Sequence, residues 1–599
     1  MSSGTPTVAI DTKSGWRGRL RAWDAERRRR RRGEPTYPEW AERYDTADTR
    51  VLAAMYERAR QLAAKPLISV LMPVYNPRPQ WLREALDSVR AQVYEHWQLC
   101  IADDLSTDPD VRRVLTEYAE RDPRIRIVFR ETNGHISAAS NSALALADGE
   151  YVALLDHDDL LPPHALLCIA ETIARFPDAA VIYSDEDKID EHGQRCAAYF
   201  KCDWNPELFR CYNLISHLGA YRTALMRAVG GFREGYEGAQ DYDLALRCVE
   251  TVPAEQVLHI PQVLYHWRIH QDSTSGGNAT KPYALDAGRR ALQEHLARNG
   301  LQADITAHAA GWYQVDYRIP QPPPTATVIV VDDGDTAALR RCIDSVLRHG
   351  DYAHYDVLIA SRNGRDVADL QSSQIPVRAL ALREARSPAA LRNAAAREAG
   401  GEILVFLDSR CEIVDADWLG RLVSFAARPG TGAVAPKLVS EEGRIVGGGV
   451  LLGLRDGFGL LGRGAKADEI GYYGRTLLSQ NLSALDDGCI AIARSAFDLA
   501  GGYPQDYRGA TAATVALCLQ AQAAGLSNVW VPSLQVRRRQ PGRLAAWLRR
   551  PARSDLERLQ ATWPQWFVRD PAYNPNLTLA RENFSLANPP RIDIRNADP

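Results

Sequence analysis

The sequence predicts an α/β fold made of two tandem domains, each built on a doubly wound, largely parallel sheet. Three observations support this prediction. Short apolar runs alternate with amphipathic helical segments from residue 65 onward, which is the pattern of βαβ units. Acidic residues stand where several of the apolar runs end. After a proline-rich stretch at 321–325, the same order of segments begins again.

Length and composition are those of a globular protein with more than one domain. The chain has 599 residues, of which 45% are hydrophobic and 25% charged, and its net charge of -3 provides no argument for a nucleic-acid partner. The ten cysteines are scattered without metal-ligand spacing, so we expect reduced thiols. We find no secretory signal and no apolar run that could span a bilayer. We therefore expect a cytoplasmic protein, peripheral at the inner face of the cytoplasmic membrane if its substrate is membrane-linked.

Residues 1–64 are predicted to form a polar extension with a helix at 45–64. The extension contains six consecutive arginines, Arg27 to Arg32. Such a run is ordinarily a solvated charge block. Attraction to an anionic membrane surface or to a phosphate-bearing lipid is the functional alternative, and the sequence leaves both open.

Residues 65–320 are predicted to form the first domain. Strands are expected at 67–72, 97–102, 125–129 and 152–155, with helices between them. Parallel strands place their carboxyl ends at one edge of a sheet, where open α/β sheets bind ligands. The polar residues that follow these strands should therefore line one crevice. A further acidic cluster, 184–187, follows an expected strand at 179–183, and it is either a contact for sugar or acceptor or a solvated turn.

The most informative stretch is 149–159, in which an apolar strand ends in Asp156, Asp158 and Asp159. Crowded carboxylates are costly unless something neutralises them. A divalent cation, Mn²⁺ or Mg²⁺, that also holds a diphosphate would do so, because these ions prefer oxygen ligands. The alternative is an acidic loop or a helix cap, in which Asp158 or Asp159 caps the helix that follows Pro162 and Pro163.

Residues 326–540 are predicted to form a second copy of the same fold. The segment 401–408 is similar to 149–156, Asn393 corresponds to Asn141, and the glycine pair 501–502 corresponds to 230–231. This shared order indicates an internal duplication. Residues 321–325 form a stiff linker. Residues 541–599 are expected to form a basic helix and an extended tail, and the helix either contacts a membrane or packs on the second domain.

The motifs of the first domain resemble family-2 glycosyltransferases with the GT-A fold, of the bacterial cell-surface polysaccharide type. Each motif is weak alone, but all occur in the family's order. The resemblance covers residues 66–280 well and residues 325–540 in a weaker form. The matching motifs are VLMPVYN at 70–76, ADDLSTD at 102–108, NGHISAASN at 133–141, LDHDD at 155–159, GGF at 230–232, QDYDL at 240–244 and YHWRIH at 265–270.

The resemblance implies a nucleotide pocket, a metal site and a catalytic base. Asp104 would accept a hydrogen bond from the base of the nucleotide, and Arg268 would contact the diphosphate. Asp158 would be a direct metal ligand and Asp241 the general base that activates the acceptor hydroxyl. The implied nucleotide-binding residues are Pro73, Tyr75, Asp103, Asp104, Asn133, Asn141 and Arg268. The implied metal ligands are Asp156 and Asp158 with His266 or His270, between which the sequence does not choose.

Simpler roles stay open for several of these residues. Asp103 could be a helix cap or turn former. Asn133 and Asn141 could only satisfy backbone groups near the site. Asp241 could be placed at a helix N-terminus because acids are favoured there by the helix dipole.

The second copy departs from the motifs where the chemistry would lie. Asp104 corresponds to Arg362, Asp158 to Arg410, Asp241 to Ala512 and His266 to Arg537, while Asp408 is retained. An arginine cannot replace a metal ligand, since its fixed charge repels the ion. The sequence therefore predicts a non-catalytic second domain, with a metal-independent second transferase as the alternative.

Taken together, the resemblance implies an inverting, metal-dependent hexosyl- or rhamnosyltransferase with tandem GT-A domains. It would move a sugar from a nucleotide-diphosphate donor to a lipid-linked glycan in O-antigen or capsule-like synthesis, with a slight preference for dTDP-rhamnose by analogy. Alternatives are a protein acceptor such as flagellin, hydrolysis or pyrophosphoryl transfer of a nucleotide sugar, and a non-catalytic glycan-binding scaffold.

Overall fold

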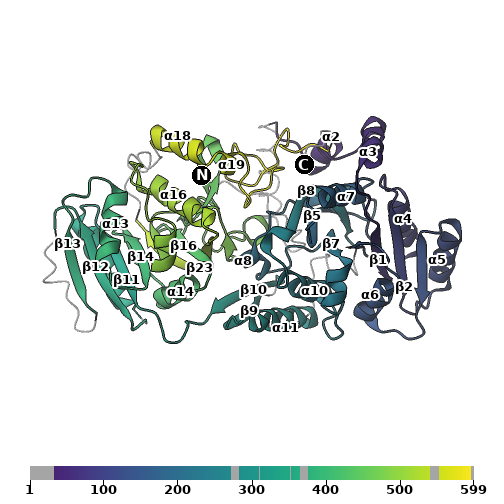
Figure 1. The fold of residues 1–599 in the computed structure, drawn as a ribbon, viewed down its shortest axis with the longest axis horizontal. Helices are drawn as coiled ribbons and strands as arrows, with labels where there is room; N and C mark the ends of the chain where they lie inside the picture. The colour runs from purple at the N-terminus through teal and green to yellow at the C-terminus, as the bar shows by residue number, and fades with distance from the viewer. Residues whose placement is uncertain are drawn as a thin grey trace, which may run out of the picture.

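The computed structural model describes residues 33–270, 282–308, 310–350, 352–364, 375–539 and 552–594. Two α/β lobes lie side by side, and the C-terminal segment runs across both (Figure 1). The arginine run at 27–32 and the basic segment at 541–551 lie outside the described residues, so their membrane hypotheses stay predictions. No helix in the described ranges has both the length and the apolar character needed to cross a bilayer.

The sheet of the first lobe has the order β3-β2-β1-β4-β7-β5-β6, with β8 paired to β5. Strands β1 to β4 are parallel to one another, as predicted, and β7 runs antiparallel to β4. Strands β1 and β2 are almost wholly buried, as strands covered on both faces are. The strands are β1 (Ile68–Val74), β2 (Trp97–Asp103), β3 (Ile125–Phe129), β4 (Tyr151–Leu154), β5 (Val181–Ile189), β6 (Arg195–Tyr199), β7 (Gly219–Arg222) and β8 (Val257–Arg268).

Two helices of this lobe show the start signals that the sequence supplies. The first of them after β1 has Pro79 in its first turn, and the one after β2 follows Asp108, whose side chain accepts a hydrogen bond from the Asp110 amide at 2.9 Å. The helices are α4 (Pro79–Arg90), α5 (Pro109–Arg121), α6 (His135–Ala145), α7 (Ala165–Arg175), α8 (Pro206–Phe209), α9 (Thr223–Ala228), α10 (Gln240–Val249) and α11 (Pro282–Arg298).

The acidic cluster 184–187 is part of a buried strand, so the expectation of a solvated turn is wrong. Strand β5 continues through these residues to Ile189 and pairs with β6 and β8. Asp185 and Asp187 have no exposed surface, and Glu186 retains 7%. Charged side chains made this segment look like a loop in the sequence, but each of them has a partner within the lobe.

The second lobe repeats the first. Strand β11 pairs with β12 and β14 from its first residue, Ala326, just as β1 pairs with β2 and β4 from Ile68. The sheet order is β13-β12-β11-β14-β22-β16-β23-β15. This lobe also has a small sheet, β19-β18-β21. The agreement in register confirms the predicted fold class of two tandem α/β units with largely parallel sheets at their centre.

The elements of the second lobe follow a hairpin of β9 (Ala303–His308) and β10 (Trp312–Tyr317). The strands are β11 (Ala326–Val331), β12 (Tyr355–Ser361), β13 (Val377–Ala381), β14 (Ile403–Asp408), β15 (Cys411–Ile413), β16 (Thr431–Val439), β17 (Ile445–Gly447), β18 (Gly449–Leu452), β19 (Phe458–Leu460), β20 (Gln480–Asn481), β21 (Ala484–Leu485), β22 (Cys489–Ala493) and β23 (Ser527–Arg538). The helices are α12 (Thr336–Arg348), α13 (Pro388–Glu398), α14 (Trp418–Ala426), α15 (Arg494–Leu499) and α16 (Ala510–Ala523).

The two ends of the chain meet over the first lobe. The N-terminal part holds α2 (Tyr37–Tyr44) and α3 (Thr49–Gln61), and the C-terminal part holds α18 (Arg553–Thr562) and α19 (Pro564–Val568). The Trp40 indole donates to the carbonyl of Ala587 at 2.7 Å, and Arg569 pairs with Asp203 at 3.0 Å. In Figure 1 the segment after α19 passes from the second lobe toward α2. The extended tail is therefore packed on the first lobe.

Candidate active site

The predicted site residues gather where β1, β2 and β4 end. These three strands are parallel and adjacent, so the loops after Val74, Asp103 and Leu154 emerge at one edge of the sheet. The Asp104 amide donates to the carbonyl of Val74 at 2.8 Å, which joins two of these loops directly. The segments expected to carry the site thus meet at the edge of the sheet where open α/β sheets bind ligands.

Asp104 is held by a basic partner and a backbone amide. Arg130 Nε donates to Asp104 Oδ1 at 2.7 Å, and the Gly134 amide donates to the same carboxylate at 3.0 Å. Asn133 Nδ2 donates to the carbonyl of Asp104 at 3.0 Å. The side chain of Asp104 is therefore fixed before any nucleotide binds, and Asn133 supports the backbone beside it.

Asp103 differs from its neighbour because one of its oxygens has no partner. The Ser106 amide donates to Oδ2 at 3.3 Å, while Oδ1 is buried without a hydrogen bond in the described part of the chain. A buried carboxylate oxygen without a donor is costly. Oδ1 is thus a buried acceptor whose capacity is unused within the described residues.

Pro73 lies near the end of β1, and Tyr75 lies in the loop that follows it. Tyr75 is 49% exposed, and the carbonyl of Pro73 lies 3.1 Å from His157 Nδ1. Asn76 Oδ1 accepts from the Thr107 amide at 2.8 Å, which fastens this loop to the loop after β2. The exposed phenol ring is in position to pack against a planar base.

Asn141 braces the backbone and has little capacity left for a ligand. Its Nδ2 donates to the carbonyl of Phe232 at 2.7 Å, and its Oδ1 accepts from the Phe232 amide at 2.8 Å. A Cβ on Gly231 would lie 2.5 Å from that oxygen. The same bracket joins Asn393 to Tyr503 in the second lobe, which favours the backbone role that the sequence left open.

The carboxylates of the acidic motif, Asp156, Asp158 and Asp159, lie just after the end of β4. Asp158 Oδ2 is 3.0 Å from His270 Nε2. The side chain of Asp156 makes no hydrogen bond or ion pair with any described residue. Burial raises the pKa of Asp156, His217 opposes the shift, and Asp158 adds to it. A carboxylate that is crowded, half-buried and unpaired is suited to a cation.

Hydrogen bonds made by Asp159 and Arg268 fix the acidic motif to β8. Tyr265 Oη donates to Asp159 Oδ2 at 2.6 Å, and the Arg268 amide donates to Asp159 Oδ1 at 2.7 Å. The Arg268 guanidinium donates to the carbonyl of Asp158 and to Glu84 Oε2, each at 2.7 Å, and its side chain is 2% exposed. This geometry assigns Arg268 a bracing function and leaves it little access to a diphosphate.

The two candidate histidines point to different partners. His266 Nδ1 lies 2.5 Å from Asp187 Oδ1, and Arg195 Nε donates to the other oxygen of Asp187 at 2.5 Å. His266 is therefore engaged in a cluster away from Asp158, whereas His270 contacts Asp158 directly. Of the two, only His270 is placed beside the predicted metal ligands.

Asp241 lies in the first turn of α10. Asn213 Nδ2 donates to Asp241 Oδ2 at 2.8 Å, and Oδ1 makes no hydrogen bond among the described residues. Asp241 is close enough to Asp156 for its charge to raise the pKa of that residue. The general-base candidate and the acidic motif therefore belong to one site.

His217 and Glu186 lie near the acidic motif, since the charges of Asp156 and Asp159 act on His217, for which the sequence predicts no role. The imidazole stacks on Tyr265, with ring centroids 4.5 Å apart, and its Nδ1 is 3.4 Å from Glu186 Oε2. Burial opposes the shift, but the Glu186 carboxylate raises the pKa of His217 to about 9. Lys201, despite the opposing effect of burial, lowers the pKa of Glu186 to about 2. The only sequence signal was the acidic cluster on β5.

The residues at the acidic motif fit a divalent cation whose ligand set is completed by substrate. Among the residues the structure describes, no group of three or more His, Cys, Asp and Glu side chains is arranged to hold a metal. Asp156, Asp158 and His270 nevertheless supply two carboxylates and an imidazole at one edge. Mg²⁺ and Mn²⁺ sites in phosphate-handling enzymes commonly use one or two carboxylates together with phosphate oxygens.

In the second lobe arginines occupy the corresponding place. Arg538 Nη2 donates to Asp408 Oδ2 at 2.9 Å, and its Nη1 donates to Asp486 Oδ1 at 2.5 Å. Arg410 Nε donates to Asp408 Oδ1 at 3.2 Å and pairs with Asp333 at 2.9 Å. The strand register aligns Arg537 with His266, since their partners Glu412 and Leu160 also correspond. The charge of Asp408 is thus balanced from within the chain.

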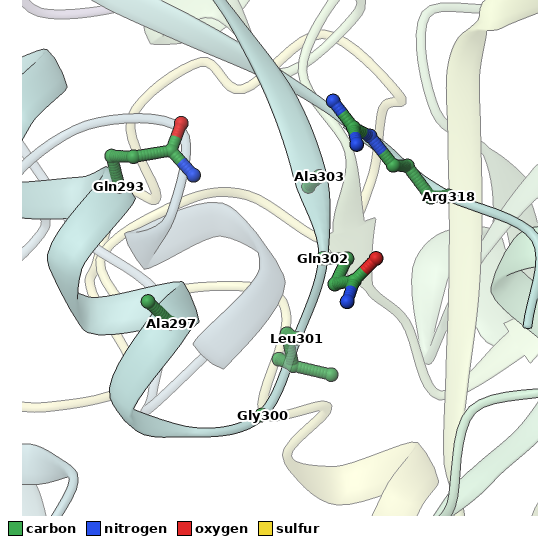
Figure 2. Close-up of a pocket in the computed structure, with 7 residues that line it drawn as sticks. All are labelled: Gln293, Ala297, Gly300, Leu301, Gln302, Ala303 and Arg318. Atoms are coloured by element: carbon green, nitrogen blue, oxygen red, sulfur yellow. The ribbon is translucent and has the colours of Figure 1, made fainter.

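A separate cavity of about 330 Å³ lies beside the end of α11 and the start of β9 (Figure 2). Figure 2 shows Gln293 and Ala297 on the helix, with Leu301 and Gln302 on the segment that leads into β9. Arg318, also in the lining, pairs with Asp304 at 2.8 Å. No predicted site residue lines this cavity, so it is not part of the candidate site.

Comparison with known proteins covers both lobes. The sequence model described as "Glycosyl transferase family 2" matches residues 69–227 and 336–497, more than half of the chain. An uncharacterized protein, y4gI, of Sinorhizobium fredii is 43% identical over 558 residues, which cover 89% of this chain and 60% of that protein. The O-antigen biosynthesis protein RfbC of Myxococcus xanthus is 34% identical over 565 residues, covering 92% of this chain and 43% of RfbC.

The chain therefore spans less than two thirds of the length of these two relatives. Among solved structures, S. aureus TarS in complex with UDP-GlcNAc is 20% identical, with a TM-score of 0.32, and the match covers 38% of this chain and 66% of TarS. The match to the family model in both lobes, together with the duplicated sheet register, establishes that the chain belongs to glycosyl transferase family 2.

Proposed function

We propose that the first lobe transfers a sugar from a nucleotide-diphosphate donor to a hydroxyl of a glycan acceptor. The observation that carries this proposal is that Asp241, in the first turn of α10, is close enough to act on Asp156 at the end of β4, where Asp158 also lies, with Asp156 unpaired among the described residues. The helix-cap alternative does not explain why these carboxylates lie close to one another.

The proposed reaction is a direct displacement in which Asp241 removes the proton of the acceptor hydroxyl. An alcohol is a weak nucleophile, so a carboxylate within hydrogen-bond reach is needed to accept its proton. Asn213 holds Asp241 Oδ2, which leaves Oδ1 for the acceptor. Attack on the face opposite the leaving diphosphate would invert the anomeric configuration, as the family resemblance implies.

The leaving diphosphate needs positive charge near Asp158. Asp156, Asp158 and His270 would hold Mn²⁺ or Mg²⁺, which when bound stabilises the charge that develops on the phosphates. We assign the imidazole ligand to His270 because the His266 ring is engaged with Asp187. Arg268 would position Asp158 through its hydrogen bond to the carbonyl of that residue.

The nucleotide would lie across the loops after β1 and β2. The exposed Tyr75 would pack on the base, and the unpartnered Asp103 Oδ1 would accept a hydrogen bond from base or ribose. Asp104, fixed by Arg130, would offer its remaining lone pairs to the same group. Pro73 and Asn133 shape this pocket through their backbone and side-chain contacts.

The acceptor we propose is a lipid-linked glycan in the synthesis of a bacterial surface polysaccharide, met at the inner face of the cytoplasmic membrane. The support is the name of the Myxococcus xanthus relative, an O-antigen biosynthesis protein, which matches across both lobes. The sugar would be a hexose or rhamnose, with dTDP-rhamnose tried first. A protein acceptor such as flagellin would be the second to test.

The second lobe would be non-catalytic, because its acidic position is neutralised by Arg538 and Arg410. Asp158→Asn should then abolish transfer, whereas Asp408→Asn should leave the transfer rate unchanged if the lobe stays folded. Activity that survives Asp158→Asn and vanishes with Asp408→Asn would reverse the assignment.

The test of the proposed function is ligand binding followed by a donor panel. Binding raises apparent thermal stability by mass action, so UDP, dTDP or GDP should raise the melting temperature, and more so with Mn²⁺. Mass detection should then find sugar transferred to lipid-linked acceptor from one donor. No shift with any nucleotide would favour a glycan-binding scaffold, and donor consumption without acceptor would favour a hydrolase.

A further inference from the structure

The loop between α8 and β7 connects the two ends of the proposed site. Asn213 contacts Asp241 through its Nδ2, and its Oδ1 accepts from the Ser216 amide at 3.1 Å. Immediately after Ser216, His217 stacks on the Tyr265 ring. The Tyr265 hydroxyl in turn accepts from the Asp156 amide at 3.3 Å. One short loop thus runs from the proposed base to the acidic motif.

Among the described residues, the polar contacts of the His217 ring are made by Nδ1 alone. Nδ1 lies 3.2 Å from Ser216 Oγ and 3.4 Å from Glu186 Oε2. The backbone is held as well, because Lys201 Nζ donates to the carbonyl of His217 at 2.6 Å and to Glu186 at 3.1 Å. The ring plane is set by Tyr265, at 15° to it. The orientation of the imidazole is therefore fixed by its surroundings.

The other ring nitrogen, Nε2, makes no hydrogen bond with any residue in the described ranges. The side chain is 19% exposed, so most of its surroundings are protein. Nε2 is not among the fully buried polar atoms that lack a partner in the described structure, so it keeps access to a ligand as well as to water. The charges that act on the ring besides Glu186 include Asp156 and Asp159, which places the ring beside the acidic motif.

We propose that His217 Nε2 binds a hydroxyl of the donor's sugar ring and so helps to select the sugar. The inference rests on the proposed function, in which the anomeric carbon lies between the diphosphate near Asp158 and the acceptor at Asp241. The loop from Asn213 to His217 spans that interval. A sugar hydroxyl both donates and accepts, so the contact forms with either protonation state of the ring. Glu186 and Lys201 act on the sugar only through His217 and are positioning residues.

The test compares two isosteric variants of His217 in the full chain. His217→Asn keeps an amide near the place of Nδ1, where it can still bond Glu186, but lacks any atom near Nε2. His217→Gln keeps an amide near Nε2 and loses the group at Nδ1. Calorimetry with Mn²⁺ would measure the affinities for UDP-glucose, UDP-N-acetylglucosamine, GDP-mannose and dTDP-rhamnose, and for UDP, GDP and dTDP.

For each donor the informative quantity is the affinity for the intact nucleotide sugar divided by the affinity for its free nucleotide. In His217→Asn this ratio should fall about tenfold for the donor that the wild type uses, with free-nucleotide affinity unchanged, because one hydrogen bond to the sugar is lost. The ratio should fall less in His217→Gln than in His217→Asn. His308→Gln, at an exposed histidine on β9, is the matched control and should leave the ratio unchanged.

Two results would overturn the assignment of His217. An unchanged ratio in His217→Asn would show that Nε2 does not touch the sugar. An equal loss of free-nucleotide and nucleotide-sugar affinity would show general damage to the site. If the wild type binds none of the nucleotides, the proposed function itself fails, and that outcome is distinct from either result.

Discussion

At the scale of single residues, Asp241 is the side chain whose replacement should separate chemistry from binding. Its carboxylate is 2.8 Å from Asn213 Nδ2 and belongs to the same site as Asp156. Asp241→Asn should lower kcat about 10²- to 10⁴-fold, because the amide cannot accept the hydroxyl proton. Steady-state kinetics and calorimetry with the donor would measure the two effects.

Donor affinity should be unchanged in Asp241→Asn, since the asparagine keeps the size of the side chain. Glu234→Gln, at an exposed position near α10, is the control and should have the wild-type kcat. A kcat within tenfold of the wild type in Asp241→Asn would exclude the base role.

His164 should make the first lobe sensitive to acid. The side chain is 2% exposed, neither ring nitrogen has a partner in the described structure, and burial lowers the pKa of His164 to about 3. His164 has an ordinary histidine pKa near 6.5 in the unfolded chain. The unfolded chain therefore binds a proton that the folded chain does not bind. Stability is therefore lost as the pH falls from about 6.5 toward 3, by up to about 1.4 kcal/mol per pH unit.

The test variant is His164→Leu, which introduces an apolar side chain of similar size and removes the group that binds the proton. Between pH 7 and pH 5 the wild type should lose about 2 kcal/mol more than this variant in the free energy of unfolding of the first lobe. Urea unfolding at the two pH values would measure the difference. Equal losses in the two proteins would show that His164 is not the origin of the acid sensitivity.

At the scale of elements, an equivalent pair of hydrogen bonds from an asparagine fixes a helix to a loop in both lobes. Asn141 on α6 and Asn393 on α13 each exchange two hydrogen bonds with one backbone residue. Replacing either by alanine leaves two buried backbone groups unpaired and should cost about 2 kcal/mol in the unfolding of its own lobe. Thermal unfolding would show which transition moves.

The two alanine variants should differ in activity. Asn141→Ala should also reduce transfer, because the bracketed loop leads into α10 and Asp241, whereas Asn393→Ala should leave the rate unchanged. A comparable loss of rate in Asn393→Ala would show that the second lobe takes part in the reaction.

The parallel half of each sheet was predictable from the sequence, because its strands are short, apolar and followed by turn residues. Strand β5 was not, since its buried end carries Asp185, Glu186 and Asp187, which resemble a solvated turn. Their burial depends on partners distant in sequence, such as Lys201 and Arg195. The role of His217 was hidden for the same reason, because stacking on Tyr265 is a tertiary contact.

The two metal-site histidines show a similar limit. His266 and His270 are equivalent in sequence, and only the strand pairing of β5 with β8 directs His266 to Asp187. The charge-balancing arginine of the second lobe was also missed, since Arg538 reaches Asp408 from the far end of β23. The sequence located the edge of the sheet correctly, but long-range pairing decides which side chains remain available there.

At the scale of the whole molecule, the C-terminal tail links the fold of the second lobe to the site of the first. Asn574 Nδ2 donates to Asp185 at 2.9 Å and to the carbonyl of Lys201 at 2.7 Å. Asp185 is fully buried, next to Glu186 on β5. Asn574→Ala should therefore destabilise the first lobe by about 1–3 kcal/mol, although residue 574 is far along the chain.

Thermal unfolding would test this coupling by showing which transition shifts. Thr578→Ala, at a half-buried position of the same tail whose hydroxyl accepts only a local hydrogen bond from the Ala580 amide at 3.2 Å, is the control and should have a smaller effect. A shift confined to the second lobe in Asn574→Ala would contradict the proposed link.

The arginine pair at Asp408 has a consequence for how the two lobes respond to their surroundings. A guanidinium is a cation attached covalently to the chain. Its presence therefore does not depend on the concentration of free metal in the cell. The first lobe, if it takes Mn²⁺ or Mg²⁺ as we propose, changes occupancy as free metal and nucleotide vary. A chelator should thus lower the ligand-stabilised transition of one lobe and leave the other as an internal reference within the same polypeptide.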